Sequence, residues 1–407
     1  MSPHPPAADP AAPRPGLLDG LDVRPSQVWG AVRLVPLVRP EPVTDLRLHP
    51  RVYGGPGLVD LGGGHAYASY IPHGLVAEWT PDGTPAAAYG TQLAEDRTRR
   101  HPDTGRTGGR ARPDQPVAAM QLHFHRRTAR REAKHRVRFL PLHLALEGYL
   151  ALHFGGPVIA WEEWSQQALR QGLSPRAEAA YLGTDVPGLA DALSVFEIHP
   201  GQCGVLVYLA DTLAAAFVVP HPEDYRTLHP TLVQDLYGDL VHHYATLMPP
   251  VPDFTARIAD GPSVRSLAGL RAAVREQAAQ WAEFHGTTLA AGLLDQPRTW
   301  QRVRRMDRFT LSRLLPPFRP REANHIGEAI TDEHGRTVYL KTFRLPEAQV
   351  RRGHLLDRLA AHDWHLAATA AGLGTTAAQF ALRLESAGFG HLLRQDVLDH
   401  YRSSHRS

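Results

Sequence analysis

The chain has 407 residues, of which 43% are hydrophobic and 21% charged, a balance typical of globular rather than disordered or fibrous proteins. This length predicts two or three domains, because one hydrophobic core rarely organises so many residues. The formal net charge is +3, and lysine occurs only at Lys134 and Lys341, so arginine supplies nearly all the cations. The single cysteine, Cys203, excludes an internal disulfide framework and a multi-cysteine zinc site. No apolar run reaches the roughly 18 residues of a membrane span, and we expect a cytoplasmic protein with no membrane partner.

The N-terminal part of the chain changes character several times. Residues 1–20 are rich in proline and alanine and predict a disordered tail. The segment 21–92 predicts short strands and turns, as at 31–38, where β-branched residues lie between glycine and proline. Residues 95–116 are rich in glycine, proline and arginine, which predicts a mobile surface loop. Residues 123–153 contain apolar residues at three- and four-residue spacing, which predicts helices.

The middle of the chain predicts a hairpin followed by a helix. Residues 195–220 contain two apolar runs that read as antiparallel strands joined at Asp211 and Thr212. A long amphipathic helix is predicted from Pro230, because proline is tolerated in the first helical turn. The proline-rich stretch at 248–254 then indicates a domain edge.

The segment 251–345 is predicted to connect the outer domains and to be mainly helical. Apolar spacing predicts helices over 263–294, and the residues at 329–343 predict a hairpin. Between them, residues 298–321 contain eight arginines and one aspartate. This basic segment has two interpretations, a solvated helix face or a surface that contacts nucleic acid.

The C-terminal residues 346–407 contain the most specific pattern in the chain. Three helices are predicted, with Gly374 in the turn between the last two and Thr375 as a candidate N-cap. The stretch 355–389 resembles the helix-turn-helix of the factor-for-inversion-stimulation type. That resemblance implies DNA or RNA binding through three residues expected on the outer side of the third helix: Thr376, Gln379 and Arg383. The alternative is a three-helix bundle for dimerisation or docking.

The basic segment would add phosphate contacts to these helices. The candidate nucleic-acid-binding residues there are Arg304, Arg305 and Arg308. Trp300 and Phe309 are candidates for stacking on bases. We expect binding to depend on these arginines, on a homodimer, or on both.

Histidines and carboxylates are concentrated around residues 220–236. Such groups can hold a ligand, bind a divalent metal or act as a general acid or base. No HExxH or DxDxDG motif is present, so no residue is assigned to a metal and the cofactor is left unknown, with a divalent metal as one alternative. Helix capping is the competing interpretation. The candidate ligand-binding residues are His199, His221, Asp224 and His229, and the candidate catalytic residues here are Asp235 and Asp239. His143 and Glu147 are further catalytic candidates: they form an i, i+4 pair on another predicted helix, and the alternative is a structural pair with satisfied hydrogen bonds.

A cysteine–histidine site is also considered at residues 196–204. Glu197, His199 and Cys203 would share one face if this segment were a continuous strand. A nucleophilic thiolate needs an activating base beside it, and nothing in the sequence indicates one. A buried, structural Cys203 is therefore the expectation.

Three stretches of the sequence carry a family resemblance: RFLPLHLALEGYLALHFGGPVIAWEEW, VFEIHPGQCGVLVYLAD and PHPEDYRTLHPTLVQDLYGDL. Together they are similar to the second type of the ADP-ribosylglycohydrolase and rhodanese-phosphatase associated proteins, over roughly residues 21–250. The resemblance implies an association with enzymes of NAD and ADP-ribose handling. It carries over no catalytic residue and no activity.

These segments predict an α+β protein: a mixed α/β domain over 21–250, the connecting region and the C-terminal helix-turn-helix bundle. The preferred function is a bacterial regulator or adaptor that senses a nucleotide-type ligand such as NAD or ADP-ribose and binds nucleic acid. One alternative is a hydrolase or phosphoryl-transfer enzyme acting on an ADP-ribosylated or phosphorylated nucleotide. Another is a non-catalytic scaffold held by proteins of ADP-ribose or NAD handling.

Overall fold

The computed structural model describes residues 16–48, 196–226, 229, 247–252, 264–306 and 308–393, the backbone of short strands between residues 59 and 139, and positions 166 and 170. The predicted loop at 95–116 and the helix predicted from Pro230 lie outside the described residues. Within the described part, no helix has both the length and the apolar character needed to cross a membrane.

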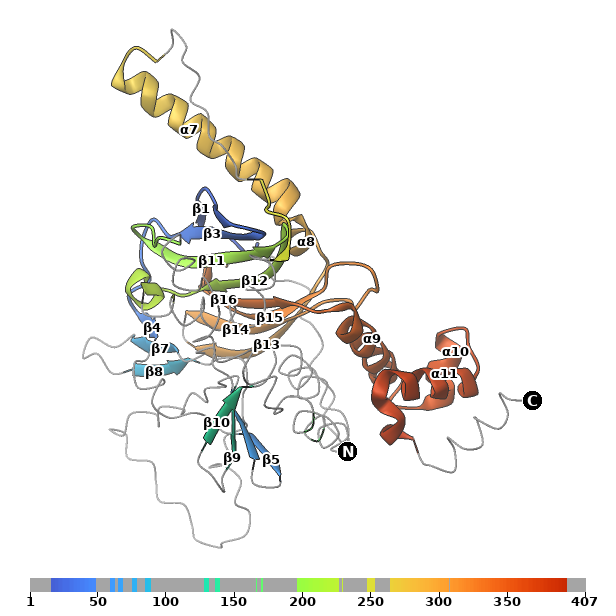
Figure 1. Ribbon diagram of the computed structural model, residues 1–407. Coiled ribbons are helices and arrows are strands. Elements are labelled where there is room, and N and C mark those ends of the chain that lie inside the picture. Colours follow the sequence, from blue (N-terminus) through green and yellow to red (C-terminus); the bar gives the residue numbers. More distant parts are fainter. Residues whose placement is uncertain are drawn as a thin grey trace, which may run out of the picture.

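A nine-stranded antiparallel sheet forms the body of the molecule (Figure 1). Its strand order is β1-β3-β11-β12-β16-β15-β14-β13, with β2 also paired to β3. The strands are β1 (Asp22–Val23), β2 (Gln27–Trp29), β3 (Val32–Val38), β11 (Gln202–Leu209), β12 (Thr212–Val218), β13 (Thr299–Met306), β14 (Phe309–Leu315), β15 (His325–Thr331) and β16 (Thr337–Arg344).

The β11–β12 hairpin confirms the sequence prediction for this region. Leu209 pairs with Thr212, and the two residues between them, Ala210 and Asp211, both have positive φ, at 47° and 54°. Two positive-φ residues make the tight turn whose twist matches that of antiparallel strands. Asp211 also accepts a hydrogen bond of 2.8 Å from Nε of the buried Arg33 on β3, which ties the turn to the neighbouring strand.

The helical prediction for 251–345 is wrong over residues 299–315, where β13 and β14 form a hairpin of the main sheet. The reason is a two-residue period in β14: Phe309 and Leu311 are buried, whereas Thr310 and Ser312 are partly exposed. The hairpin expected over 329–343 is confirmed by β15 and β16. One sheet therefore contains strands from both sides of the domain edge predicted near residue 250.

The two faces of this sheet are covered differently. One face buries a cluster that includes Val205, Val207, Phe217 and Phe343. The other face contacts three consecutive segments through Trp281, Leu289 and Leu293: α7 (Leu267–Phe284), the π-helical turn η6 (His285–Leu289) and α8 (Ala291–Leu294). This confirms helices within 263–294. Figure 1 shows that α7 touches the body only at its C-terminal end and projects away from it.

Two smaller antiparallel sheets lie beside the main one. Their strands are β5 (Val59–Gly62), β6 (His65–Ala68), β9 (Thr128–Arg131) and β10 (Arg136–Phe139) in one sheet, and β4 (Leu46–Leu48), β7 (Leu75–Glu78) and β8 (Pro85–Ala88) in the other. Short strands were expected within 21–92. The helical prediction for 123–153 is wrong at β9 and β10, where Val137 and Phe139 alternate with arginines at the period of a strand.

The C-terminal segment forms helices around its own core. The helices are α9 (Glu347–Ala361), α10 (Leu366–Gly372), α11 (Ala377–Leu384), the π-helical turn η7 (Glu385–Phe389) and the short η8 (Gly390–Leu392). Leu356, Leu359, Phe380, Leu384 and Phe389 are buried among them. The predicted helices are confirmed within the described residues, although the identification as a helix-turn-helix of one named type stays a prediction. We call residues 347–392 the C-terminal helical unit.

Candidate functional site

A buried tyrosine and histidine form the centre of the predicted ligand region. Residues 222–226 make a short helical turn, and Tyr225 Oη lies 2.9 Å from Nδ1 of His229. Burial lowers the pKa of His229, an effect that the backbone of Phe196 partly offsets, so the imidazole is neutral near pH 7. Burial also raises the pKa of Tyr225. Nε2 of His229 is buried and makes no hydrogen bond to a described side chain.

Gln202, at the start of β11, links this pair to His199. Its Oε1 accepts a hydrogen bond of 2.9 Å from the backbone N–H of His199, and its side chain lowers the pKa of Tyr225 through a hydrogen bond. Nε2 of His199 in turn lies 3.4 Å from Nε2 of Gln27 on β2. The structure therefore connects two of the predicted residues, His199 and His229, through Gln202 and Tyr225.

The other two predicted ligand residues have different surroundings. His221 caps the short turn, because its Nδ1 accepts a hydrogen bond of 3.2 Å from the backbone N–H of Glu223. Asp224 is buried, with 7% of its surface exposed. His221 therefore caps the turn, and a ligand-binding role stays a prediction for all four residues, His199, His221, Asp224 and His229.

The predicted catalytic residues His143, Glu147, Asp235 and Asp239 lie outside the described residues, so their convergence stays a prediction. In the part of the chain that is described, no group of three or more histidine, cysteine, aspartate or glutamate side chains could hold a metal ion.

Cys203 is a core residue. It is fully buried on the face of the sheet that contacts α7, and its Sγ lies 3.7 Å from the carbonyl oxygen of Leu37. Burial raises the pKa of the thiol, although nearby Arg39 opposes this effect. A thiol held protonated is a poor nucleophile. Glu197 and His199 both precede β11, which begins at Gln202. Glu197 is exposed whereas Cys203 is buried, so the three residues do not share one face of a strand.

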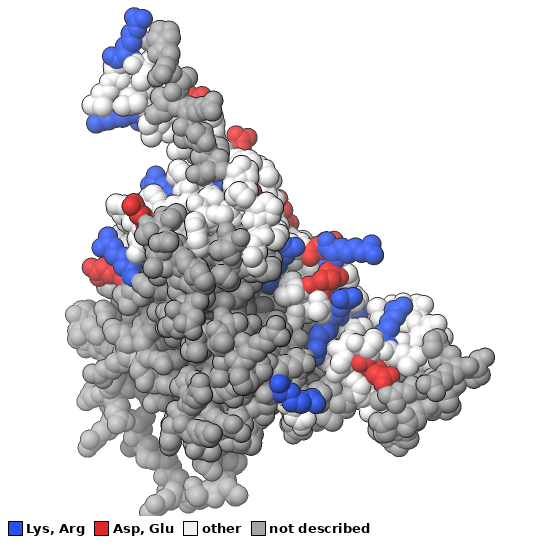
Figure 2. Space-filling model, in the orientation of Figure 1, with Lys and Arg blue, Asp and Glu red and all other residues white. Residues whose placement is uncertain are grey.

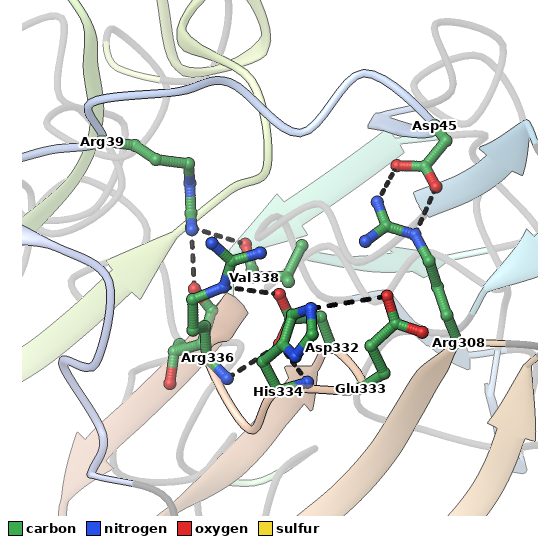
Figure 3. Close-up of polar contacts among 9 residues, drawn as sticks. Arg39, Asp45, Arg308, Asp332, Glu333, His334, Arg336 and Val338 are labelled. Carbon is green, nitrogen blue, oxygen red and sulfur yellow. Dashed lines mark hydrogen bonds and ion pairs between the residues drawn. The ribbon is translucent and has the colours of Figure 1, made fainter.

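The turn between β15 and β16 gathers a second polar cluster (Figure 3). Asp332 is buried, and its carboxylate accepts hydrogen bonds from the backbone N–H groups of His334 and Arg336, at 3.0 and 2.9 Å. Nε of Arg336 donates a third, at 2.8 Å. Arg39 approaches from the other side and donates to the carbonyl oxygen of Thr337 at 2.8 Å. These hydrogen bonds stabilise the β15–β16 turn, so the cluster has a structural role.

The basic segment is less available to nucleic acid than the sequence predicts. Nε and Nη2 of Arg308 bond the carboxylate of Asp45, with Nε at 2.6 Å, so this guanidinium already has an anionic partner, and its role as a phosphate contact stays a prediction. Phe309 is fully buried and therefore cannot stack on bases. Trp300 is partly buried and packs against the hydrophobic cluster on the α7 side of the sheet. Arg304 and Arg305 lie on the edge strand β13, and Arg305 is exposed.

On α11 the three predicted residues are all exposed, but two of them cap the helix. The N-cap is Thr376 rather than Thr375: its Oγ1 accepts from the N–H of Gln379 at 3.2 Å, and the Gln379 side chain returns to the N–H of Thr376. This reciprocal capping commits both side chains to the helix start. Arg383 is in the last turn, and its side chain is exposed.

Sequence reasoning missed a buried polar pair beneath α7. Tyr208 Oη on β11 lies 2.7 Å from Nε2 of His285, the first residue of η6. Burial, and next the charge of Arg33, lower the pKa of His285 to about 4. The sequence signal for this pair was a tyrosine in a strand of mostly apolar residues. A buried phenol needs a hydrogen-bond partner, so such a tyrosine predicts a polar side chain opposite it, although not which one.

Comparison of the sequence with known protein families identifies one match. The ARPP-2 family model matches residues 17–307, from the segment before β1 to the turn after β13. No curated protein and no solved structure matches the chain. The matched segment is more than half of the 407 residues and ends before β14–β16 and the C-terminal helical unit. The chain therefore belongs to the ARPP-2 family, the ADP-ribosylglycohydrolase and rhodanese-phosphatase associated proteins.

Proposed function

We propose that the protein is a regulator or adaptor linked to ADP-ribose handling that binds duplex DNA through its C-terminal helical unit. The observation that carries this proposal is the α10–α11 pair. Four residues, 373–376, connect the two helices, and Gly374 among them has a φ of +63°. Short turns that contain glycine are typical of helix pairs that place their second helix in the major groove.

The packing of α11 leaves its outer side free for such a contact. Phe380 and Leu384 face the core of the unit, and the small Ala370 on α10 is buried against them. Small residues permit close approach of two helices. The exposed Thr376, Gln379 and Arg383 occur at spacings of three and four residues, so they lie on the same side of α11.

The capping bonds give these three residues different roles. Thr376 and Gln379 fix the start of α11, so their contribution is to position the helix. Arg383 is the side chain we expect to contact phosphates or base edges. Exposed arginines elsewhere on the unit, such as Arg351 on α9, would add phosphate contacts. The unit also contains acidic residues, which predicts modest affinity with a strong dependence on salt.

Fluorescence anisotropy of a labelled DNA duplex with the full-length protein tests this proposal. We expect saturable binding at low salt that Arg383→Ala weakens about fivefold or more. The matched control is Arg24→Ala, an exposed arginine before β2. Equal loss in both variants, or tighter binding to an RNA hairpin than to the duplex, contradicts the proposal.

A second candidate function, sensing of a nucleotide-type ligand such as ADP-ribose or NAD, is favoured by the Tyr225–His229 pair. Its support is the buried imidazole of His229, whose Nδ1 contacts Tyr225 Oη and whose Nε2 makes no hydrogen bond to a described side chain. A bound ligand stabilises the native state by mass action, so thermal unfolding with ADP-ribose tests it. We expect a rise in the unfolding temperature that is lost in His229→Asn and retained in His334→Asn, at an exposed histidine. A rise retained in both variants contradicts it.

A further inference from the structure

The projecting helix α7 carries apolar side chains that face solvent. Leu267, Leu270 and Val274 have 63%, 39% and 51% of their surface exposed. Their spacing of three and four residues places them in one narrow row along the helix, which we call the α7 seam. The same spacing continues through Gln277 to Trp281, which is fully buried against the body. The seam is therefore the exposed continuation of a row whose inner end is already packed.

The base of α7 is held firmly in place. Nε1 of Trp281 donates a hydrogen bond of 2.8 Å to the carbonyl oxygen of Arg24, and His285 follows with its bond to Tyr208. At the outer end, Ser266 caps the helix by accepting from the N–H of Gly269 at 3.0 Å. The helix is thus anchored at one end and capped at the other, with no described segment covering the seam between them.

The charges on α7 are distributed unevenly around the helix. Arg271 follows Leu270 directly and lies on one border of the seam, and Arg275 is one turn further along on the same side of the helix but farther from the seam. Glu276 and Glu283 are nine residues beyond Leu267 and Val274, which is two and a half turns and places them on the opposite side. Figure 2 shows basic atoms at the outer end of the projecting helix and acidic atoms nearer the body.

This arrangement is unfavourable for α7 by itself. Arg271 and Arg275 are like charges four residues apart, and like charges at that spacing repel. They also lie in the half of the helix nearest its positive dipole end, where the first turn contains no acidic residue. Acidic groups placed along the arginine border would remove both penalties.

We propose that the α7 seam docks an acidic amphipathic helix of a partner protein, in which a row of leucine-type residues is bordered by carboxylates. Apolar residues at heptad spacing on each helix would interdigitate, and the carboxylates would pair with Arg271 on the border of the seam, with the positive charge of Arg275 beyond it on the same side. A second copy of the chain is a poorer occupant, because it would bring the same arginines together and its Trp281 end is already buried. The seam is also narrower than the apolar face of a helix that lies on a membrane.

Two designed peptides serve as probes. Both are labelled 21-residue helices with leucine at heptad positions a and d; one has glutamate at positions e and g, the other lysine. With the full-length protein in anisotropy measurements, we expect the glutamate peptide to bind at least tenfold more tightly than the lysine peptide. Leu270→Asp should abolish that binding, and Arg271→Glu with Arg275→Glu should reverse the preference. Arg319→Glu, at an exposed arginine between β14 and β15, is the matched control and should change neither affinity.

The variants alter exposed side chains, and circular dichroism should show an unchanged fold. Equal affinity for the two peptides, no binding of either, or unchanged binding in Leu270→Asp overturns the proposal. Two further readouts identify other occupants. Flotation with vesicles of phosphatidylglycerol and phosphatidylcholine that Leu270→Asp abolishes would assign the seam to a membrane. Self-association in sedimentation equilibrium that the same variant abolishes would assign it to a second copy. Either result overturns the partner-helix proposal.

Discussion

The phenolic oxygen of Tyr208 lies 2.7 Å from Nε2 of His285, with both residues buried. Tyr208 belongs to a central strand of the main sheet, and His285 is the residue at which α7 passes into its π-helical turn. The two rings meet edge to face, with centroids 5.8 Å apart. This contact fixes the direction in which α7 leaves the body.

Tyr208→Phe removes the partner of a buried imidazole while keeping the ring. We expect a loss of about 1–3 kcal/mol in the free energy of unfolding, because an unsatisfied buried polar group bears its desolvation cost alone. Urea unfolding followed by fluorescence measures it. The double variant Tyr208→Phe/His285→Leu should lose less than the sum of the two single variants, since both polar partners are then absent. Strict additivity would show that the hydrogen bond contributes nothing.

Acid should destabilise the protein through its buried histidines. The pKa of His285 is lowered to about 4, and burial followed by Arg344 and Arg298 lowers that of His325 to about 3. A histidine with a lowered native pKa is protonated first in the unfolded chain, so the unfolded state binds more protons below pH 6.5. Stability is therefore complete above about pH 6.5 and falls as the pH drops toward 4 and then 3.

For His285 alone this loss amounts to about 3 kcal/mol, at about 1.4 kcal/mol for each unit of pKa shift. Urea midpoints between pH 7 and pH 4 measure the dependence. His285→Gln should flatten it, whereas His334→Gln, at an exposed position, should leave it unchanged. A stability that rises on acidification would contradict the assignment of neutral, buried histidines.

Gly374 tests the turn between α10 and α11. Its φ of +63° is left-handed, although a Cβ added there would meet no atom within 4 Å. Gly374→Ala should therefore lower the free energy of unfolding by about 1–2 kcal/mol through backbone strain alone. Gly374→Asn should lower it less, because asparagine tolerates left-handed backbone angles. Hydrogen exchange of α10 and α11 measures the effect. Equal protection in the wild type and Gly374→Ala would contradict a left-handed turn.

A small cavity between α8 and the sheet provides another test. His325 and Thr342 line it, and Nδ1 of the histidine and Oγ1 of the threonine are both buried without a hydrogen bond to the described residues. Thr342→Val keeps the shape and removes the unpaired hydroxyl, so stability should be unchanged or rise by up to about 1 kcal/mol. Calorimetry measures it. A loss of more than about 1 kcal/mol would show instead that the hydroxyl holds an ordered water.

The sequence predicted those elements whose pattern was local. The hairpins at 202–218 and 325–344 were recognisable because apolar runs lie on either side of residues suited to a turn, such as Asp211 and Gly335. The third C-terminal helix followed from Gly374 and the buried pair Phe380 and Leu384, with its start displaced by one residue.

The errors arose where long-range pairing decided the structure. Arginine-rich residues of β13 resemble a solvated helix until β14 pairs with them, and a two-residue period is difficult to detect over so few apolar positions. Similarly, Arg308 bonds Asp45, which is 263 residues away, and Tyr208 bonds His285, which is 77 residues away. Propensity and periodicity contain no information about such partners, so both contacts became visible only with the fold.

The dependence of DNA affinity on salt tests the central claim most directly. For the full-length protein on a labelled duplex, we predict that the logarithm of the affinity falls linearly with the logarithm of salt concentration. Replacing Arg383 by alanine should reduce that slope by about 1, because one phosphate-bound cation is lost, and Arg24→Ala should leave it unchanged. No retardation or anisotropy change with DNA at low salt, or the same slope in wild type and Arg383→Ala, would contradict DNA binding through α11.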